Sequence, residues 1–95
     1  IAALRGAPGL LMAEPCCADE VEPLLRICMG LEESIYLRLV SVPWDIPFSL
    51  PEGYQPAPGQ GCMLRKGTDA AIIAYGPITL SESFRAAEAL EKEGL

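Results

Sequence analysis

The sequence predicts an α/β fold in which a parallel βαβ unit is followed by a Pro- and Gly-rich linker and by the start of a second α/β domain. Three features support this prediction: two apolar runs flank an amphipathic stretch, a segment dense in proline and glycine follows, and another apolar run precedes an Ala- and Glu-rich stretch. Apolar runs of roughly four to eight residues are typical of buried strands, and a 3.6-residue period is typical of helices. We therefore divide the chain into residues 1–42, 43–60 and 61–95.

The first of these parts contains the pattern of strand, helix and strand. Residues 9–15 form an apolar run between a Pro-Gly turn and a proline, which indicates a short strand. Residues 16–29 predict an amphipathic helix, because four apolar residues recur there at helical spacing: Val21, Leu24, Leu25 and Cys28. Residues 34–40 are aliphatic and aromatic with a single charge, which predicts a second buried strand. Such a unit places its two strands parallel.

Residues 43–60 have the composition of an interdomain linker. Their prolines and glycines exclude a helix and leave little room for a strand. Prolines also hold a linker in an extended path. Because the segment carries apolar side chains that a freely solvated linker lacks, we expect it to lie along a surface; these are Trp44, Ile46, Phe48 and Tyr54.

The third part predicts the opening of another α/β unit. Residues 61–67 fit a short edge strand, and residues 70–75 are the strongest strand candidate in the chain. Thr79 and Glu82 have the spacing of a capping box, from which we expect a helix through Leu90, with Gly94 as a stop signal.

Composition narrows the classes of function. The 95 residues carry 7 Lys and Arg against 13 Asp and Glu, a net charge of −6, which opposes binding to nucleic acid or to an anionic membrane. No apolar run approaches the roughly 18 residues of a membrane span, and the opening residues lack the pattern of a signal peptide, so we expect a cytoplasmic protein.

The cysteines offer no metal site. They lie at positions 16, 17, 28 and 62, with no C-x-x-C and no histidine in the chain. We expect Cys16, Cys17 and Cys28 to be small buried side chains in a reducing compartment. The alternative is a thiol-based redox module, since a helix N-terminus stabilises a thiolate, although Asp19 and Glu20 would oppose it.

Several fragments in a fixed order resemble the transketolase-like family of thiamine diphosphate enzymes over nearly the whole chain. They are Ala7-Pro-Gly-Leu10, Pro15-x-x-x-x-Glu20, Ile35-Tyr-Leu-Arg-Leu39, Gly59-x-Gly61-x-x-Leu-Arg-x-Gly67-x-Asp69, Ile72-Ile-Ala-Tyr-Gly76 and the helical Ala86 to Glu88. The resemblance implies that residues 1–42 end a pyrimidine-binding domain, that residues 43–60 link two domains, and that residues 61–95 begin a transketolase C-terminal-like domain. It is shared by transketolase, deoxyxylulose phosphate synthase and 2-oxoacid dehydrogenase beta subunits.

The resemblance also implies a parent enzyme that binds thiamine diphosphate and Mg²⁺ and transfers a two-carbon unit from a ketose or 2-oxoacid. The family's catalytic glutamate, its ring-stacking aromatic residue and its histidines precede the stretch covered here, and its metal motif belongs to another domain. We therefore expect a structural section with no catalytic, cofactor-binding or metal-binding residue. Its partners would be the rest of the parent chain or a complementary subunit, in a homo- or hetero-oligomer such as a dimer.

Two departures from the family pattern bear on individual residues. Many members have a second arginine after this strand that grips the sugar phosphate, whereas this chain has Ser41. Arg38 is thus the one candidate substrate-binding residue, and an ion pair between domains or at the strand edge is the more ordinary role for it. The family's helix-capping aspartate is replaced by Cys17, a poor cap, for which Asp19 is expected to compensate. The missing second arginine and the apolar side chains of the linker keep open a second interpretation, a non-catalytic scaffold or interaction module derived from the family.

Overall fold

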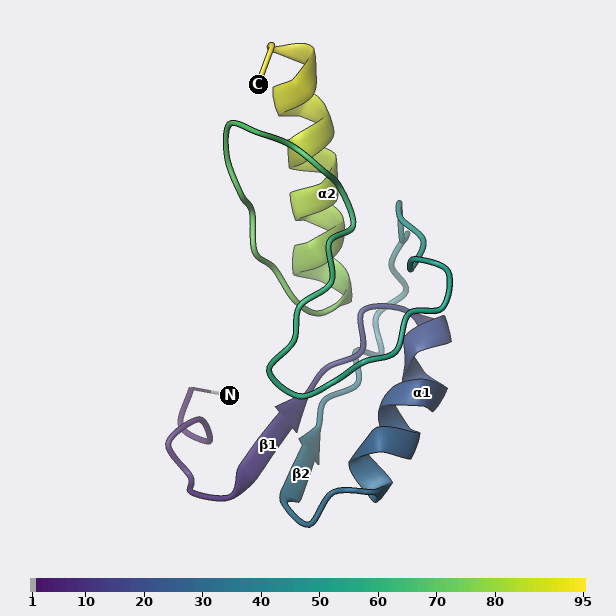
Figure 1. Ribbon diagram of the computed structural model, residues 1–95, viewed down its shortest axis with the longest axis vertical. Coiled ribbons are helices and arrows are strands. Elements are labelled where there is room, and N and C mark those ends of the chain that lie inside the picture. Colours follow the sequence, from purple (N-terminus) through teal and green to yellow (C-terminus); the bar gives the residue numbers. More distant parts are fainter. Residues whose placement is uncertain (1) are drawn as a thin grey trace.

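The computed structural model describes residues 2–95 and confirms the predicted βαβ unit. Its elements are β1 (Leu10–Ala13), α1 (Ala18–Met29), β2 (Ser34–Leu37) and α2 (Pro77–Lys92). β1 and β2 pair in parallel, with Leu10 opposite Ser34 and Ala13 opposite Leu37. Figure 1 shows α1 alongside this two-stranded sheet, while α2 extends away from it toward the C-terminus.

Both strands are shorter than the predicted runs of residues 9–15 and 34–40. The ladder ends with the bond from the Arg38 N–H to the Ala13 carbonyl at 2.9 Å. Two residues further on, Pro15 has no N–H to offer, so the pairing cannot continue along that strand. The short ladder therefore follows from the sequence that comes directly after β1.

The linker lies along both helices and contains no helix or strand of its own. Near its start, the ring of Phe48 lies 5.9 Å from the ring of Phe84 on α2. Further along, the Tyr54 hydroxyl donates a hydrogen bond to Glu20 on α1. The expectation that the linker follows a surface agrees with these contacts, although Trp44 is exposed.

The two strands predicted in the third part do not form. Residues 61–67 and 70–75 have no strand pairing, and the side chain of Ile73 is 97% exposed. A strand exists only where its backbone groups pair with a neighbouring strand, and within residues 2–95 no third strand is available. Residues 70–75 therefore have the composition of a strand but no neighbouring strand with which to pair.

The helix of the third part is present but begins earlier than predicted. α2 begins at Pro77, with Gly76 as N-cap and no side-chain capping bond, so the expected capping box at Thr79 and Glu82 is wrong. Proline fits the first helical position, where an N–H has no partner in any case.

The predicted stop of α2 at Gly94 is confirmed. Gly94 has a φ of 91°, its N–H bonds to the Glu91 carbonyl, and the Leu95 N–H bonds to the Leu90 carbonyl at 3.0 Å. This pair of bonds is the Schellman motif that ends many helices. The Leu90 and Glu91 carbonyls of the last turn of α2 are thereby satisfied within the chain.

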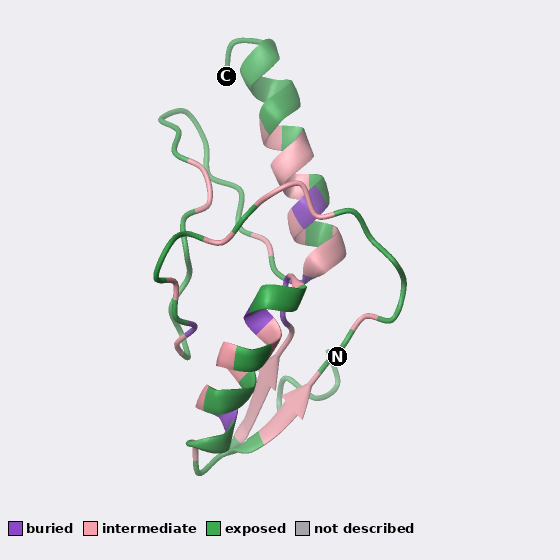
Figure 2. Ribbon diagram, turned by 90° about the vertical axis from the view of Figure 1, so that its right-hand side faces the viewer, coloured by how far each residue is buried: buried purple, intermediate pink, exposed green. Residues whose placement is uncertain are grey.

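The apolar core is small. The buried apolar side chains among the described residues are all small, namely those of Pro15, Cys16, Cys28 and Pro56, whereas many large ones are exposed. Figure 2 shows exposed residues over the C-terminal part of α2 and over most of the loops. Exposed apolar surface of this extent marks a protein interface or an aggregation hazard. Within the same residues, no helix is long and apolar enough to cross a membrane.

Candidate functional site

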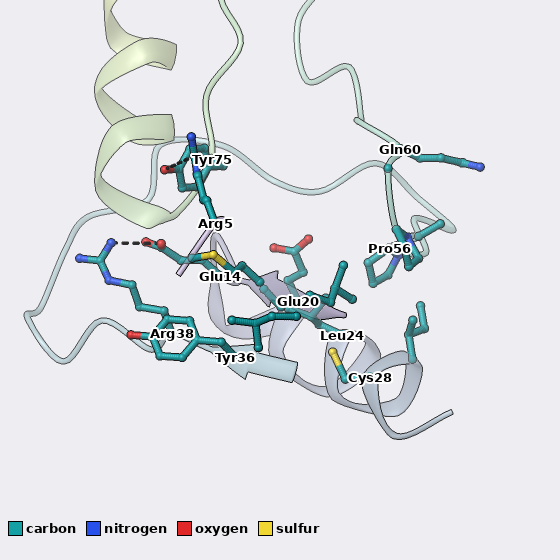
Figure 3. A pocket seen from close by; sticks show the side chains of 18 of the residues that line it. Arg5, Glu14, Glu20, Leu24, Cys28, Tyr36, Arg38, Pro56, Gln60 and Tyr75 are labelled. Atoms are coloured by element: carbon teal, nitrogen blue, oxygen red, sulfur yellow. Dashed lines mark hydrogen bonds and ion pairs between the residues drawn. The ribbon is translucent and has the colours of Figure 1, made fainter. Parts of the chain in front are cut away.

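A cleft of about 510 Å³ lies where the linker passes over the βαβ unit. One wall is formed by β1 and α1, and the other by linker residues 54–60, which include Tyr54. Figure 3 shows further polar and charged side chains that reach this cleft, among them Arg5, Glu14, Glu20, Arg38 and Tyr75. Their pairing decides which chemistry the cleft can support.

Arg38 forms an ion pair with Glu14 at the ends of the two strands. The Arg38 Nη1 lies 3.2 Å from Glu14 Oε2, and the two side chains are 46% and 13% exposed. The parallel register brings these residues together, because Glu14 follows Ala13 and Arg38 follows its partner Leu37. The guanidinium of the one predicted substrate-binding residue is thus engaged by a carboxylate of the chain itself.

Glu14 also contacts the start of α2. A side chain at Gly76 would overlap the Glu14 carboxylate, and Gly76 has a φ of 74°. The positive φ favours glycine at this position, and a Cβ here would also require the Glu14 side chain to move. The carboxylate therefore lies between the strand ends and the N-terminus of α2.

Glu20 is the most connected polar residue of the cleft. It is 8% exposed; its Oε2 accepts the Cys16 N–H at 2.7 Å, and its Oε1 accepts the Tyr54 O–H at 2.7 Å. Cys17 is the N-cap of α1 and makes no side-chain capping bond. The expected compensation by Asp19 is not observed, and Glu20 binds the N–H of the residue before the N-cap, not one of the helix itself. The sequence feature that could have predicted this role is the position of Glu20 in the first turn of the helix, from which a glutamate side chain can reach back to a preceding backbone N–H.

The Tyr54 phenol remains protonated in this environment. Burial and the hydrogen bond to Glu20 raise the pKa of Tyr54 well above its ordinary range. Its hydroxyl is consequently a stable donor to the carboxylate. Sequence reasoning identified Tyr54 as an apolar anchor and missed this polar role, because its partner lies 34 residues away in the chain.

The two adjacent thiols do not form an activated pair. Burial, followed by the nearby Glu20, raises the pKa of the Cys16 thiol far above its ordinary value, which disfavours the thiolate that redox chemistry requires. The Cys16 Sγ donates a long hydrogen bond to the Cys17 Sγ at 4.0 Å, and no disulfide joins the two sulfurs. Cys16 and Cys28 are buried as predicted, Cys17 is only half-buried, and Cys62 is exposed. The geometry therefore favours packing over a redox role for Cys16.

The residues of the cleft do not suit Mg²⁺ and a diphosphate. Both carboxylates already have partners, and the Arg5 Nη2 is engaged with the Tyr75 hydroxyl at 3.2 Å. No group of three His, Cys, Asp or Glu side chains able to hold a metal occurs between residues 2 and 95. Mg²⁺ binds several oxygen ligands, and here both Glu20 oxygens and one Glu14 oxygen are already engaged by donors of the chain itself.

Comparisons with known proteins indicate the family to which the chain belongs. It is 36% identical over its whole length to a putative uncharacterized transketolase family protein of Sinorhizobium fredii and 33% identical to a 1-deoxy-D-xylulose-5-phosphate synthase of Trichormus variabilis. It is also 30% identical over its whole length to one of the subunits of the apulose-4-phosphate transketolase of Phocaeicola vulgatus. The chain belongs to the transketolase-like family, as its motifs indicated.

The match covers only part of each relative. The chain spans 27% of the S. fredii protein, 15% of the T. variabilis synthase and 30% of the P. vulgatus transketolase polypeptide. No family model matches the chain, and no solved structure matches it. What the whole protein does is therefore a matter for proposal.

Proposed function

We propose that the chain is a section of a transketolase-like transferase that uses thiamine diphosphate and Mg²⁺ to transfer a two-carbon unit from a ketose or a 2-oxoacid. The observation that carries the proposal is the similarity over the whole chain to transketolase-family proteins and 1-deoxy-D-xylulose-5-phosphate synthases. These families depend in general on thiamine diphosphate. The parent is taken to be cytoplasmic.

Within this enzyme, the section has an architectural role. It completes the parallel sheet of a pyrimidine-binding domain with residues 1–42, crosses to the next domain through residues 43–60, and opens a transketolase C-terminal-like domain with residues 61–95. The unpaired segment of residues 70–75 supports this role, because its exposed apolar side chains suit a strand of a larger sheet. The cofactor would be held by other parts of the parent or by a complementary subunit, since the cleft residues are already paired.

A transketolase assay of the intact parent protein, together with any partner subunit, tests the proposal. We expect ketol transfer from at least one ketose or 2-oxoacid donor that depends on added thiamine diphosphate and Mg²⁺. The readout is product formation with and without the cofactor, and calorimetric titration measures cofactor binding independently of turnover. Absence of both turnover and cofactor binding, in a folded protein, contradicts the proposal.

A scaffold or interaction module derived from the family is the second candidate. The specific observations that favour it are Ser41 in place of the phosphate-gripping arginine and the pairing of Arg38 with Glu14. The upstream sequence separates the two candidates. A catalytic glutamate within an intact pyrimidine-binding domain supports the enzyme, and its absence supports the scaffold.

A further inference from the structure

The linker is fixed at more than one point along its length. Its beginning is held on α2, where Arg85 donates to the Asp45 carboxylate at 2.9 Å and Phe84 packs on Phe48. Its middle is held on α1 by the Tyr54 hydrogen bond to Glu20. The first attachment involves an exposed ion pair, which contributes little free energy. The second involves a buried carboxylate, so its loss has a larger effect.

The Glu20 carboxylate serves the helix and the linker through separate oxygens. Oε2 accepts the Cys16 N–H and so satisfies a donor one residue before the N-cap of α1, while Oε1 accepts the Tyr54 hydroxyl. The N-cap Cys17 provides no competing acceptor. The same side chain therefore contacts both the segment that leads into α1 and the linker that passes over it.

The backbone around Tyr54 is ordered on both sides of this contact. The Tyr54 N–H closes a turn on the Pro51 carbonyl at 3.0 Å, and the Gln60 N–H closes the next turn on Ala57 at 3.1 Å. Between these turns, Pro56 is buried in the cleft wall. Two turns and a buried proline thus accompany the hydroxyl that reaches Glu20.

We propose that Glu20 is a positioning residue that fixes the middle of the linker on α1 through Tyr54, and thereby sets how the βαβ unit is joined to α2. The assignment rests on these contacts and is independent of the proposed transferase activity. It gives the glutamate of the Pro15-x-x-x-x-Glu20 motif a physical role in joining the two parts of the chain.

Hydrogen exchange of the intact parent protein, followed by mass spectrometry, tests this role. Tyr54→Phe removes one hydroxyl, and we expect it to accelerate exchange of the Tyr54 and Gln60 amides about tenfold while leaving the Cys16 amide unchanged. Glu20→Ala should accelerate all three amides, because it removes both acceptor oxygens. Glu20→Gln should restore protection of the Cys16 amide, since its side-chain oxygen still accepts that N–H.

Glu22→Ala is the matched control. Glu22 lies on the same helix, is exposed, and pairs with Arg26 at 2.7 Å. It should leave the three amides unchanged. In the double variant, adding Tyr54→Phe to Glu20→Ala should not accelerate linker exchange further, because the two residues act through one bond.

Unchanged linker exchange in Tyr54→Phe overturns the proposal, even if Glu20→Ala fails to fold. Equal acceleration by Glu22→Ala and Glu20→Ala also overturns it, because the effect would then belong to the helix as a whole.

Discussion

The βαβ unit of residues 10–37 and the stretch of residues 61–95 share the same kind of sequence and differ in structure. Each contains an apolar run with β propensity and a helix-forming stretch. In the first, the two runs pair with each other around α1. In the second, α2 forms but the run at residues 70–75 stays unpaired and exposed.

The comparison shows how differently helices and strands depend on the rest of a protein. A helix satisfies its backbone groups within its own segment, so α2 forms with only part of one face covered. A strand satisfies them only on a neighbour, and the first stretch contains that neighbour whereas the second does not. The first stretch contains both strands of its own pair, whereas the second contains a run with β propensity that has no strand partner among the described residues.

The largest expected effect concerns the backbone of residues 70–75. In the 95-residue chain their amides should exchange within about tenfold of the random-coil rate, while the paired amides of β1 and β2 are protected. In the intact parent, pairing with a further strand should slow the same amides by at least about a hundredfold. Hydrogen exchange of both proteins measures this. Equal exchange rates of residues 70–75 in the two proteins would contradict the idea that these residues gain a strand partner in the parent.

Gly76, where the two stretches meet, gives the next largest effect. Gly76→Ala should lower the free energy of unfolding of the parent by about 1–3 kcal/mol, because the new Cβ overlaps the Glu14 carboxylate and φ is positive. Gly59→Ala is the matched control, since Gly59 has nearly the same φ of 73° and open space around it. Urea denaturation should give a smaller loss for the control. Equal losses would mean that the contact with Glu14 contributes nothing.

The thiols sharpen the contrast between a buried and an exposed site. Cys16 should react with iodoacetamide at least about tenfold more slowly than Cys62, because Cys16 is buried and its raised pKa keeps the thiol protonated. Mass spectrometry of the labelled parent measures both rates. Faster labelling of Cys16 would support the redox interpretation instead.

The same raised pKa values set a pH dependence of stability. Cys16 and Tyr54 have ordinary pKa values of 9.0 and 10.0, and both are raised in the folded chain, so the unfolded chain releases these protons first. Their contribution should be fully present below pH 9.0 and decline as the pH rises above it. Denaturation of the parent between neutral and alkaline pH measures this, and Tyr54→Phe should reduce the decline.

Arg38 gives the smallest expected effect on stability. Arg38→Ala should lower the free energy of unfolding by less than about 1 kcal/mol, because its ion pair with Glu14 is partly exposed. If Arg38 also contacts an anionic substrate, Arg38→Ala should raise KM for that substrate while Glu14→Gln leaves KM unchanged. Steady-state kinetics of the parent distinguish substrate binding from a purely structural role. An unchanged KM in both variants would mean that Arg38 only forms the ion pair with Glu14.

Residues whose partners are local could be predicted well from the sequence. The stripe from Val21 to Cys28 predicted α1, and Gly94 predicted the end of α2. The start of α2 was missed because Thr79 and Glu82 imitate a capping box, although Pro77 at the first helical position was the stronger signal. The polar contacts of the cleft were missed because Tyr54 and Glu20 are 34 residues apart, a separation over which no spacing rule applies.

The sequence alone determined the family, the βαβ unit and the existence of both helices, since motifs, periodicity and helix ends are local properties. Only the tertiary structure decided that Arg38 pairs with Glu14, that Glu20 joins α1 to the linker, and that residues 70–75 remain unpaired. Each of these depends on which distant groups meet, and a strand or a buried carboxylate is stable only when such a partner is present.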